Sequence, residues 1–230
     1  MNEITLKTGK DKAVHRKHPW IFSGAIGTVK GNPVNGEPVR VFNSNKDFIG
    51  IGSYSPQSQI RVRMWTFQNE EINEEFFLKK IKSSIESRKQ ALYGFNDTAW
   101  RLVFAESDQI PWFIVDQYND VLIIQVLFSG VEYFRDQILS ALKDATKIEN
   151  VYERSDLDVR KLEGLPEQTG LVGGVVPDLV EIVENGYKFL VDIKNGHKTG
   201  FYIDQRINRK IVGNYCKGKS VLNVFSYTGG

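Results

Sequence analysis

The chain has 230 residues, of which 41% are apolar and 25% charged, a balance that is typical of globular proteins and excludes wholesale disorder. No apolar run approaches the roughly 18–20 residues of a membrane helix, and the N-terminal stretch lacks the apolar region of a secretory signal, so we expect no membrane partner. The single cysteine, Cys216, can form no internal disulfide, which indicates a reducing compartment, the cytoplasm.

Charge is distributed unevenly along the chain. Residues 1–69 contain ten Lys and Arg against four Asp and Glu, a net charge of +6. Residues 70–230 contain 20 basic against 24 acidic residues, a net charge of −4. This asymmetry indicates that the N-terminal third meets a polyanion such as nucleic acid, although small β-domains also carry basic surfaces by chance.

The first third of the chain predicts a compact β-barrel or sandwich. Short runs rich in Val, Ile and aromatic residues alternate with turn clusters such as GNPVNGEP, and the predicted strands are 4–7, 21–30, 38–44, 48–55 and 59–67. The last run alternates, with Ile60, Val62 and Met64 on one face and Arg61, Arg63 and Trp65 on the other. This pattern predicts one buried face and one exposed, basic face.

A change of period near residue 70 predicts a domain boundary followed by a helix over 73–92. Its buried stripe is Phe77, Ile81, Ile85 and Leu92. Glu74 and Glu75 lie in the first turn, where they complement the helix dipole.

Residues 100–185 predict an α+β unit with hairpins before and after one helix. The expected strands are 101–107, 112–118, 121–128, 150–155, 179–186 and 187–193, and the expected helix is 131–145 with Phe134, Ile138 and Leu142 buried. Asn119 and Asp120 form the expected tight turn between the second and third strands.

The last stretch predicts a helix over 204–216 that Asp204 caps and whose apolar side is Ile207, Ile211, Val212 and Tyr215. Residues 220–225 predict a buried parallel strand, and a glycine-rich turn follows it. Because one helix and one strand cannot bury both faces of a sheet, we expect this chain to be the leading portion of a longer protein. The uncovered tail would then fray, dock on the preceding domain or pair between chains as a homodimer.

Two charged stretches are candidates for contact with RNA. In RKHPWIFSGAI, residues 16–26, Arg16, Lys17 and His18 adjoin Trp20, which suits phosphate contact with base stacking; a buried Trp20 beside a solvated basic turn is the alternative. In YERSDLDVRKLEGL, residues 152–165, Arg160 and Lys161 are candidate substrate contacts; an internal salt-bridge network is the alternative.

Two further stretches are candidates for a small-molecule site. NGHKTGFYIDQRINR, residues 195–209, combines glycines, aromatic rings and side chains of both charges, which suits a zwitterionic, partly aromatic ligand. Its His197 has no Cys or His partner at metal-ligand spacing, so we expect no metal. SVLNVFSYTGG, residues 220–230, is a strand running into a glycine turn, where α/β folds bind nucleotide-like ligands, although it is neither GxGxxG nor a P-loop.

The stretches KHPWIFSGAI, RLVFAESDQIPWFIVDQY, RKLEGL, GHKTGFYIDQRINR and VLNVFSYTGG resemble, in order, a family of S-adenosylmethionine-dependent methyltransferases that form 5-methylcytosine in 23S rRNA. The resemblance runs from Val14 to Gly230. It implies an α+β multi-domain protein. Residues 1–69 would be a PUA RNA-binding domain, 73–185 a linker helix and an EEHEE domain, and 187–230 the start of a Rossmann-like α/β methyltransferase domain.

The resemblance also implies which residues bind. The residues expected at the cofactor, S-adenosylmethionine, are Phe201, Tyr202, Asp204, Gln205, Arg206, Asn208, Asn223, Phe225, Tyr227, Thr228, Gly229 and Gly230. Asn223 departs from the Asp that many methyltransferases have there. The residues expected to contact ribosomal RNA are Arg16, Lys17, His18, Trp20, Arg61, Arg63, Arg160 and Lys161.

No catalytic residue is expected within the chain. In the family's chemistry a cysteine thiolate adds to C6 of cytosine, and the resemblance puts that cysteine beyond residue 230. Cys216 precedes the expected strand and is interpreted as a small core residue; the 230 residues alone are therefore expected to be inactive. Two alternatives stay open: a non-catalytic RNA-binding protein of PUA and EEHEE modules, and an RNA methyltransferase acting on guanine.

Overall fold

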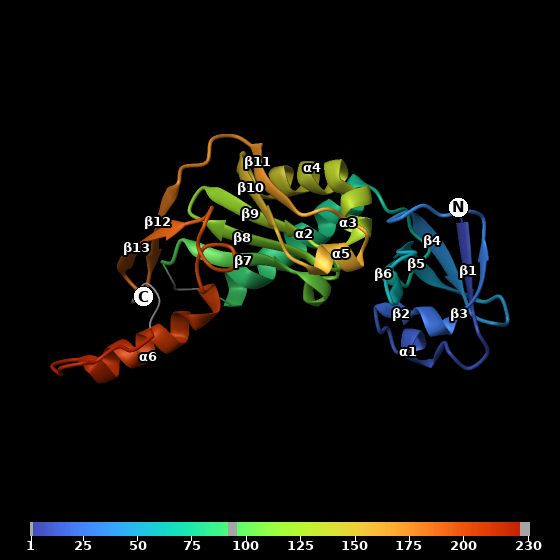
Figure 1. Ribbon diagram of the computed structural model, residues 1–230, viewed down its shortest axis with the longest axis horizontal. Coiled ribbons are helices and arrows are strands. Elements are labelled where there is room, and N and C mark those ends of the chain that lie inside the picture. The colour runs from blue at the N-terminus through green and yellow to red at the C-terminus, as the bar shows by residue number, and fades with distance from the viewer. Residues whose placement is uncertain (1, 92–95, 226–230) are drawn as a thin grey trace.

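The computed structural model describes residues 2–91 and 96–225, and Figure 1 shows an elongated molecule of mixed α+β class. A small β-domain lies at one end, and a five-stranded sheet with its helices, the central unit, lies in the middle. A two-stranded hairpin with a long helix lies at the other end. Within the described residues, no helix is both long and apolar enough to cross a membrane.

The N-terminal β-domain is one six-stranded sheet in the order β2-β6-β5-β4-β1-β3, with β1 and β4 parallel and the other pairs antiparallel. Its elements are β1 (Asn2–Leu6), α1 (Lys12–His15), β2 (Trp20–Phe22), η1 (Ser23–Ala25), β3 (Ile26–Lys30), β4 (Pro38–Phe42), β5 (Phe48–Tyr54) and β6 (Ile60–Thr66). The alternating apolar residues of these strands fill its core, as expected for strands with one buried face.

Strand β6 is buried on both faces, which corrects the prediction of an exposed, basic face. Val62 and Met64 lie in the core of the β-domain, whereas Trp65 packs with Ile51 and Phe77 in the core of the central unit. Arg63 on that second face is only 1% exposed. One face of β6 thus packs in the core of the β-domain and the other in the core of the central unit.

Helix α2 (Glu74–Ala91) joins the two units and begins where the sequence predicts. Asn73 caps it, since its Oδ1 accepts a hydrogen bond from the backbone N–H of Phe76 (3.0 Å). Phe77 and Ile81 are fully buried against the central sheet and Ile85 packs beside them; Leu92 lies outside the described residues.

The central sheet has the order β11-β10-β9-β8-β7. Its strands are β7 (Ala99–Phe104), β8 (Phe113–Tyr118), β9 (Val121–Val126), β10 (Asn150–Ser155) and β11 (Gln168–Gly173), and short helices lie between them: η2 (Ala105–Asp108), α3 (Ser129–Tyr133), α4 (Arg135–Thr146) and α5 (Val159–Leu162). Helices α2 and α4 cover one face, with Phe134, Ile138 and Leu142 buried as predicted.

The order of strands after α4 differs from the prediction. Strand β10 returns parallel to β9, and its antiparallel partner is β11, which the sequence analysis missed. Gly170 and Gly173 depress the strand propensity of this run, so its pattern is weak. Residues 179–193 instead form a separate hairpin of β12 (Leu179–Glu184) and β13 (Tyr187–Asp192), which packs on the sheet face opposite the helices through Val180, Ile182 and Val191.

The C-terminal stretch corrects three predictions. Asp204 lies within η3 (Ile203–Gln205) and is not the cap, because α6 (Arg206–Cys216) begins two residues later. The apolar side of α6 is exposed, with Ile207 at 65% and Tyr215 at 73%, and Cys216 is half-buried at its end and not in a core. Residues 221–225 are exposed and form no strand, because none of the described strands lies beside them to complete a ladder.

Candidate functional site

The basic turn between α1 and β2 has the exposure that phosphate contact requires. Arg16, Lys17 and His18 are all exposed, and Lys17 adopts φ 62°, which turns the chain sharply before β2. The backbone N–H of Trp20 donates to Nδ1 of His18 (3.2 Å), so the turn has a defined shape. The side chains of Arg16 and Lys17 are exposed and can approach an anion from solvent.

Trp20 is half-buried, so it is neither fully exposed for base stacking nor a fully buried core residue. Its indole Nε1–H donates to Oε1 of Glu106 (2.7 Å), a residue of η2 that follows β7. His18 and Phe22 lie edge-on to its ring, with centroids 5.8 Å and 6.5 Å away. Trp20 therefore connects the basic turn to the central sheet.

Arg63, expected to contact RNA, is instead part of a buried ion pair. Its Nη1 donates to Oε1 of Glu163 (2.8 Å), and its guanidinium lies over the rings of Trp112 (4.4 Å) and Phe128 (4.8 Å). Burial lowers the pKa of Arg63 from its ordinary value, while Glu163 opposes that shift. The prediction fails for this residue because the second face of β6 is an interdomain surface.

The prediction that Arg160 contacts RNA is also wrong, because its side chain is only 1% exposed. It donates to the backbone carbonyls of Val126 and Pro166 and pairs with Glu132 (3.3 Å). Within the charge-dense stretch 152–165, Glu153, Arg160 and Glu163 thus belong to an internal network, as the alternative interpretation expects for these residues. Its RKLEGL motif joins the domains, because Glu163 also accepts from Oγ of Ser55 (2.8 Å).

Two further predicted RNA contacts keep partial exposure. Lys161 is 62% exposed and pairs with Asp158 (2.9 Å) and Glu167 (2.8 Å), and the hydrogen bond with Asp158 is the main cause of its raised pKa. Arg61 is half-buried and donates to the carbonyl of Pro56. Both can reach solvent, unlike Arg63 and Arg160.

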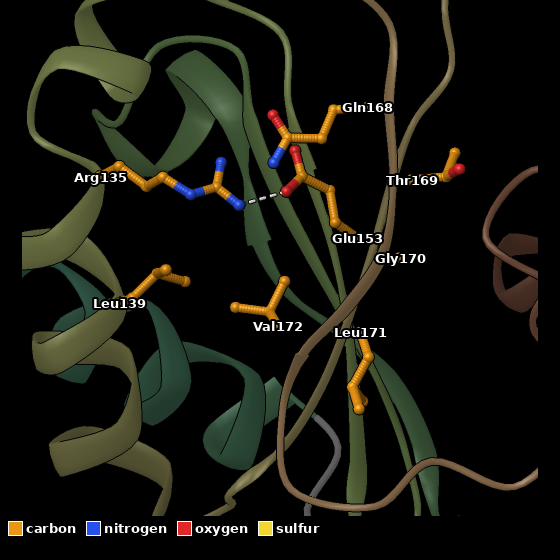
Figure 2. A pocket seen from close by; sticks show the side chains of 8 residues that line it. All are labelled: Arg135, Leu139, Glu153, Gln168, Thr169, Gly170, Leu171 and Val172. Carbon is orange, nitrogen blue, oxygen red and sulfur yellow. Dashed lines mark hydrogen bonds and ion pairs between the residues drawn. The ribbon is translucent and has the colours of Figure 1, made fainter.

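An open hollow of about 330 Å³ lies between α4 and the edge strand β11. Figure 2 shows Arg135 extending from α4 toward Glu153 of β10, with which it forms an ion pair, while Leu139 and Val172 supply apolar walls. None of the residues that line this hollow belongs to the predicted site.

Residues 195–209, called here the cofactor segment, begin in the loop after β13, and this loop folds closely on itself. Backbone N–H groups of Lys194 and Asn195 donate to Oδ1 of Asp192 (3.1 and 2.8 Å), and the hydrogen bond from Asn195 is the main cause of the lowered pKa of Asp192. A Cβ on Gly196 would lie 2.3 Å from the carbonyl oxygen of Asp192, and Gly200 has φ +126°. Both positions therefore require glycine.

A buried polar cluster holds this loop against the central sheet. Oγ1 of Thr199 donates to Oδ2 of Asp116 (2.6 Å), and the hydroxyl of Tyr118 lies 2.8 Å from Oγ1 of Thr199. Arg101 makes two hydrogen bonds to the same carboxylate (2.8 and 2.9 Å). Burial and the nearby Asp116 raise the pKa of Tyr118, so this hydroxyl stays neutral.

The two arginines of the segment hold its position. Arg206, predicted at the cofactor, is 7% exposed; it pairs with Asp97 (2.9 Å) and donates to the carbonyl of Ala99 (2.5 Å), so its guanidinium is directed into the protein. Arg209 makes two hydrogen bonds to Glu184 (2.6 and 2.8 Å) and lies 4.3 Å above the ring of Phe201. The start of α6 is thereby fixed to β7 and β12.

The remaining cofactor candidates fall into three groups. In the first group, Tyr202, Asp204 and Asn208 are exposed and Gln205 is partly exposed. A carboxylate, two amides and a phenol therefore face solvent, and these groups can bind the ammonium and the ribose hydroxyls of S-adenosylmethionine. Phe201 packs against Phe189 (centroids 5.3 Å apart), and Asn223 and Phe225 are exposed. Tyr227, Thr228, Gly229 and Gly230 lie outside the described residues.

Sequence reasoning missed the residues that hold these surfaces in place, chiefly Asp116, Thr199 and Glu163. Asp116 carried a signal, because a single acid within the apolar strand FIVDQY implies a buried partner. Glu163 and Thr199 carried none that distinguishes them from solvated loop residues. In the described part of the chain, no group of three or more His, Cys, Asp or Glu side chains is arranged to hold a metal ion.

Two family models match parts of the chain. Residues 4–67 match the model of PUA-like domains, which confirms the expected PUA-like domain. Residues 168–230 match the model of S-adenosylmethionine-dependent methyltransferases, in agreement with the expected cofactor. The second match begins in β11, ahead of the domain boundary expected at residue 187.

Solved structures have the same fold at low identity. A Streptococcus mutans protein described as a SAM-dependent methyltransferase superposes with a TM-score of 0.75 at 21% identity, covering 93% of this chain and 54% of the other. A second structure, described as a methyltransferase complexed with SAH, gives a TM-score of 0.76 at 21% identity, with the same coverage.

Curated relatives are closer in sequence. Ribosomal RNA large subunit methyltransferase I of Tolumonas auensis is 49% identical over 230 residues, and that of Aeromonas salmonicida is 48% identical over 229 residues. Each alignment covers 99% of this chain, and the chain spans 58% of the length of each relative.

Proposed function

We propose that this chain forms the RNA-binding and cofactor-facing part of an S-adenosylmethionine-dependent methyltransferase that makes 5-methylcytosine in large-subunit ribosomal RNA. One observation carries the proposal: strand β7 connects the basic turn, the candidate RNA surface, to the cofactor segment, the candidate cofactor surface. Trp20 of the basic turn bonds to Glu106 just after β7 (2.7 Å), and Arg206 at the start of α6 bonds to Ala99 at its beginning (2.5 Å).

The similarity to the relatives supports the same proposal. The relatives are named for action on large-subunit rRNA, and one structural neighbour is described as a complex with SAH. In this chain, Tyr202, Asp204, Gln205 and Asn208 would contact the cofactor, which supplies the methyl group when bound. The nucleophilic cysteine would come from the rest of the gene product, consistent with the half-buried position of Cys216 on α6.

We propose the domain division 1–69, 73–185 and 187–230, a cytoplasmic location and rRNA as the partner. Sheet β1–β6 ends at Thr66, and the PUA-like match ends at residue 67, which supports the first boundary. The homodimer is proposed from the exposed apolar side of α6, where Ile207, Ile211, Val212 and Tyr215 are 47–73% exposed.

RNA binding by the basic turn tests the proposal. Because Lys and Arg displace counterions from phosphates, the affinity for a large-subunit rRNA fragment should fall steeply with salt. The double variant Arg16→Ala, Lys17→Ala should bind more weakly at low salt. Its plot of log K against log[salt] should be flatter, with the negative slope smaller in magnitude by about 2, near one unit for each lost phosphate contact. The matched control is Lys188→Ala, an exposed lysine of β13 that pairs with Glu181. An unchanged slope and affinity would remove the basic turn from the RNA surface.

A further inference from the structure

Phe104 is an exposed aromatic side chain at the end of β7, and the interactions described so far leave it unexplained. It is 46% exposed, although its neighbours Leu102 and Val103 on the same strand are fully buried. An aromatic ring held at the surface of an otherwise buried strand offers a flat apolar face against which a planar group can stack.

The backbone and ring of Phe104 are both held in place. Its N–H donates to Oδ2 of Asp108 (2.6 Å), and Asp108 forms an ion pair with Arg88 of α2 (2.5 Å). The guanidinium of Arg101 lies 5.1 Å from the centroid of the Phe104 ring. The next residue, Ala105, has φ 47°, a left-handed conformation that is unfavourable for a residue with a Cβ.

The register of the sheet places Phe104 between the two candidate surfaces. Phe104 is opposite Ile114 and Arg101 is opposite Asp116, and both pairs lie on the face that Thr199 and the cofactor segment contact. The Arg101 guanidinium lies 5.1 Å from the ring centroid of Phe104 and bonds to Asp116 (2.8 and 2.9 Å), so the ring adjoins the Arg101–Asp116 pair. In the other direction, Glu106 two residues later bonds to Trp20.

We propose that Phe104, with Arg101 against its ring, is a stacking platform for an unpaired base of the substrate RNA on its path from the basic turn to the cofactor segment. This inference rests on the proposed function and adds a specific residue and RNA structure to it. Single-stranded bases stack on aromatic rings and on guanidinium planes, and a strand can follow such a path between fixed phosphate contacts. The exposed cations of the basic turn, Arg16 and Lys17, favour RNA over a protein segment as the occupant, because Trp20 connects this turn to Glu106, two residues after Phe104.

The test compares two RNAs: a hairpin whose loop is unpaired and a duplex of equal length without unpaired bases. In the 230-residue chain, Phe104→Ala should weaken binding of the loop RNA about 10-fold or more, the loss typical of one stacked base. Duplex affinity and the salt slope of both RNAs should not change, because the phosphate contacts remain. Phe104→Trp should keep the loop affinity and should add Trp fluorescence quenching on binding of the loop RNA.

The matched control is Tyr133→Ala in α3, an aromatic residue that is 49% exposed and borders the helix-covered face of the sheet through Phe134. It should leave both affinities unchanged. Wild-type loop affinity in Phe104→Ala, with weakened binding in the Arg16→Ala, Lys17→Ala variant, would refute the platform and keep the proposed function. Equal weakening of loop and duplex by Phe104→Ala would also refute it, whereas unchanged binding in both variants would refute the proposed function itself.

Discussion

Arg63 and Glu163 show how a charged pair at the residue scale fixes the arrangement of two domains. Each side chain is 1% exposed, and the pair joins β6 to the residue that follows α5. Two charges are costly to bury, so the pair contributes little net stability compared with apolar residues of the same size. The pair instead favours the one arrangement of the two domains in which Arg63 meets Glu163, because in any other arrangement the buried Arg63 would be an uncompensated charge.

Loss of one partner should therefore be severe. Arg63→Ala leaves the Glu163 carboxylate buried without its cation, and we expect the free energy of unfolding to fall by about 3–5 kcal/mol. Urea unfolding measures this change. Arg61→Ala on the same strand is the control and should change stability by less than about 0.5 kcal/mol, while the double variant Arg63→Met, Glu163→Leu should recover most of the loss. Equal effects of the two single variants would contradict this account of the interface.

Asp192 gives the loop before the cofactor segment a defined pH dependence. Because backbone N–H groups lower its pKa, its stabilising hydrogen bonds are fully present above the ordinary carboxyl value of about 3.9 and are lost as the pH falls through the lowered pKa. The amide resonance of Asn195 should accordingly titrate with an inflection below about 3.9. Asp192→Asn should abolish the inflection. An inflection at or above 3.9 would contradict the assigned cause.

At the scale of elements, hydrophobic periodicity predicted those strands and helices that have one buried face. The stripe of α4 is an example, because its own side chains determine which face is buried. The hairpin around Asn119 was predicted from its turn residues and its apolar runs instead, since β9 is buried on both faces. Strand β11 was missed because its pairing depends on β10 and not on its own glycine-containing sequence. The positions of Arg63 and Arg160 were wrong for a related reason: a distant segment buries them, and no local pattern reports that.

Residues 221–225 should be the least protected apolar run of the described chain. Leu222 is 87% exposed and the run forms no ladder, whereas β9 is buried along its whole length. In dilute monomer, amides of 221–225 should exchange faster than those of 121–126 by a factor on the order of 10³ or more, since core strands open only with global unfolding. Hydrogen exchange measures this ratio. Equal protection in a monomer would show that the run has structural cover.

At the scale of the whole molecule, the chain presents two surfaces on one continuous framework. Ile51 and Trp65 of the β-domain pack in the core of the central unit, and Thr199, Arg206 and Arg209 hold the cofactor segment against the opposite end. The sequence indicated both surfaces through charged and aromatic residues, of which Arg63, Arg160 and Arg206 are buried. It did not predict the framework between them, because that depends on contacts between residues about 80–110 positions apart, such as Tyr118 with Thr199 and Arg206 with Ala99.

Methyl transfer by the intact gene product tests the central claim most directly. Unmodified large-subunit rRNA is incubated with the protein and S-adenosylmethionine carrying a labelled methyl group, and the nucleosides are then identified by mass spectrometry. The account predicts label in 5-methylcytosine for the intact gene product and none for the 230-residue chain alone. Label in a methylguanosine, or no label from the intact protein, would contradict it.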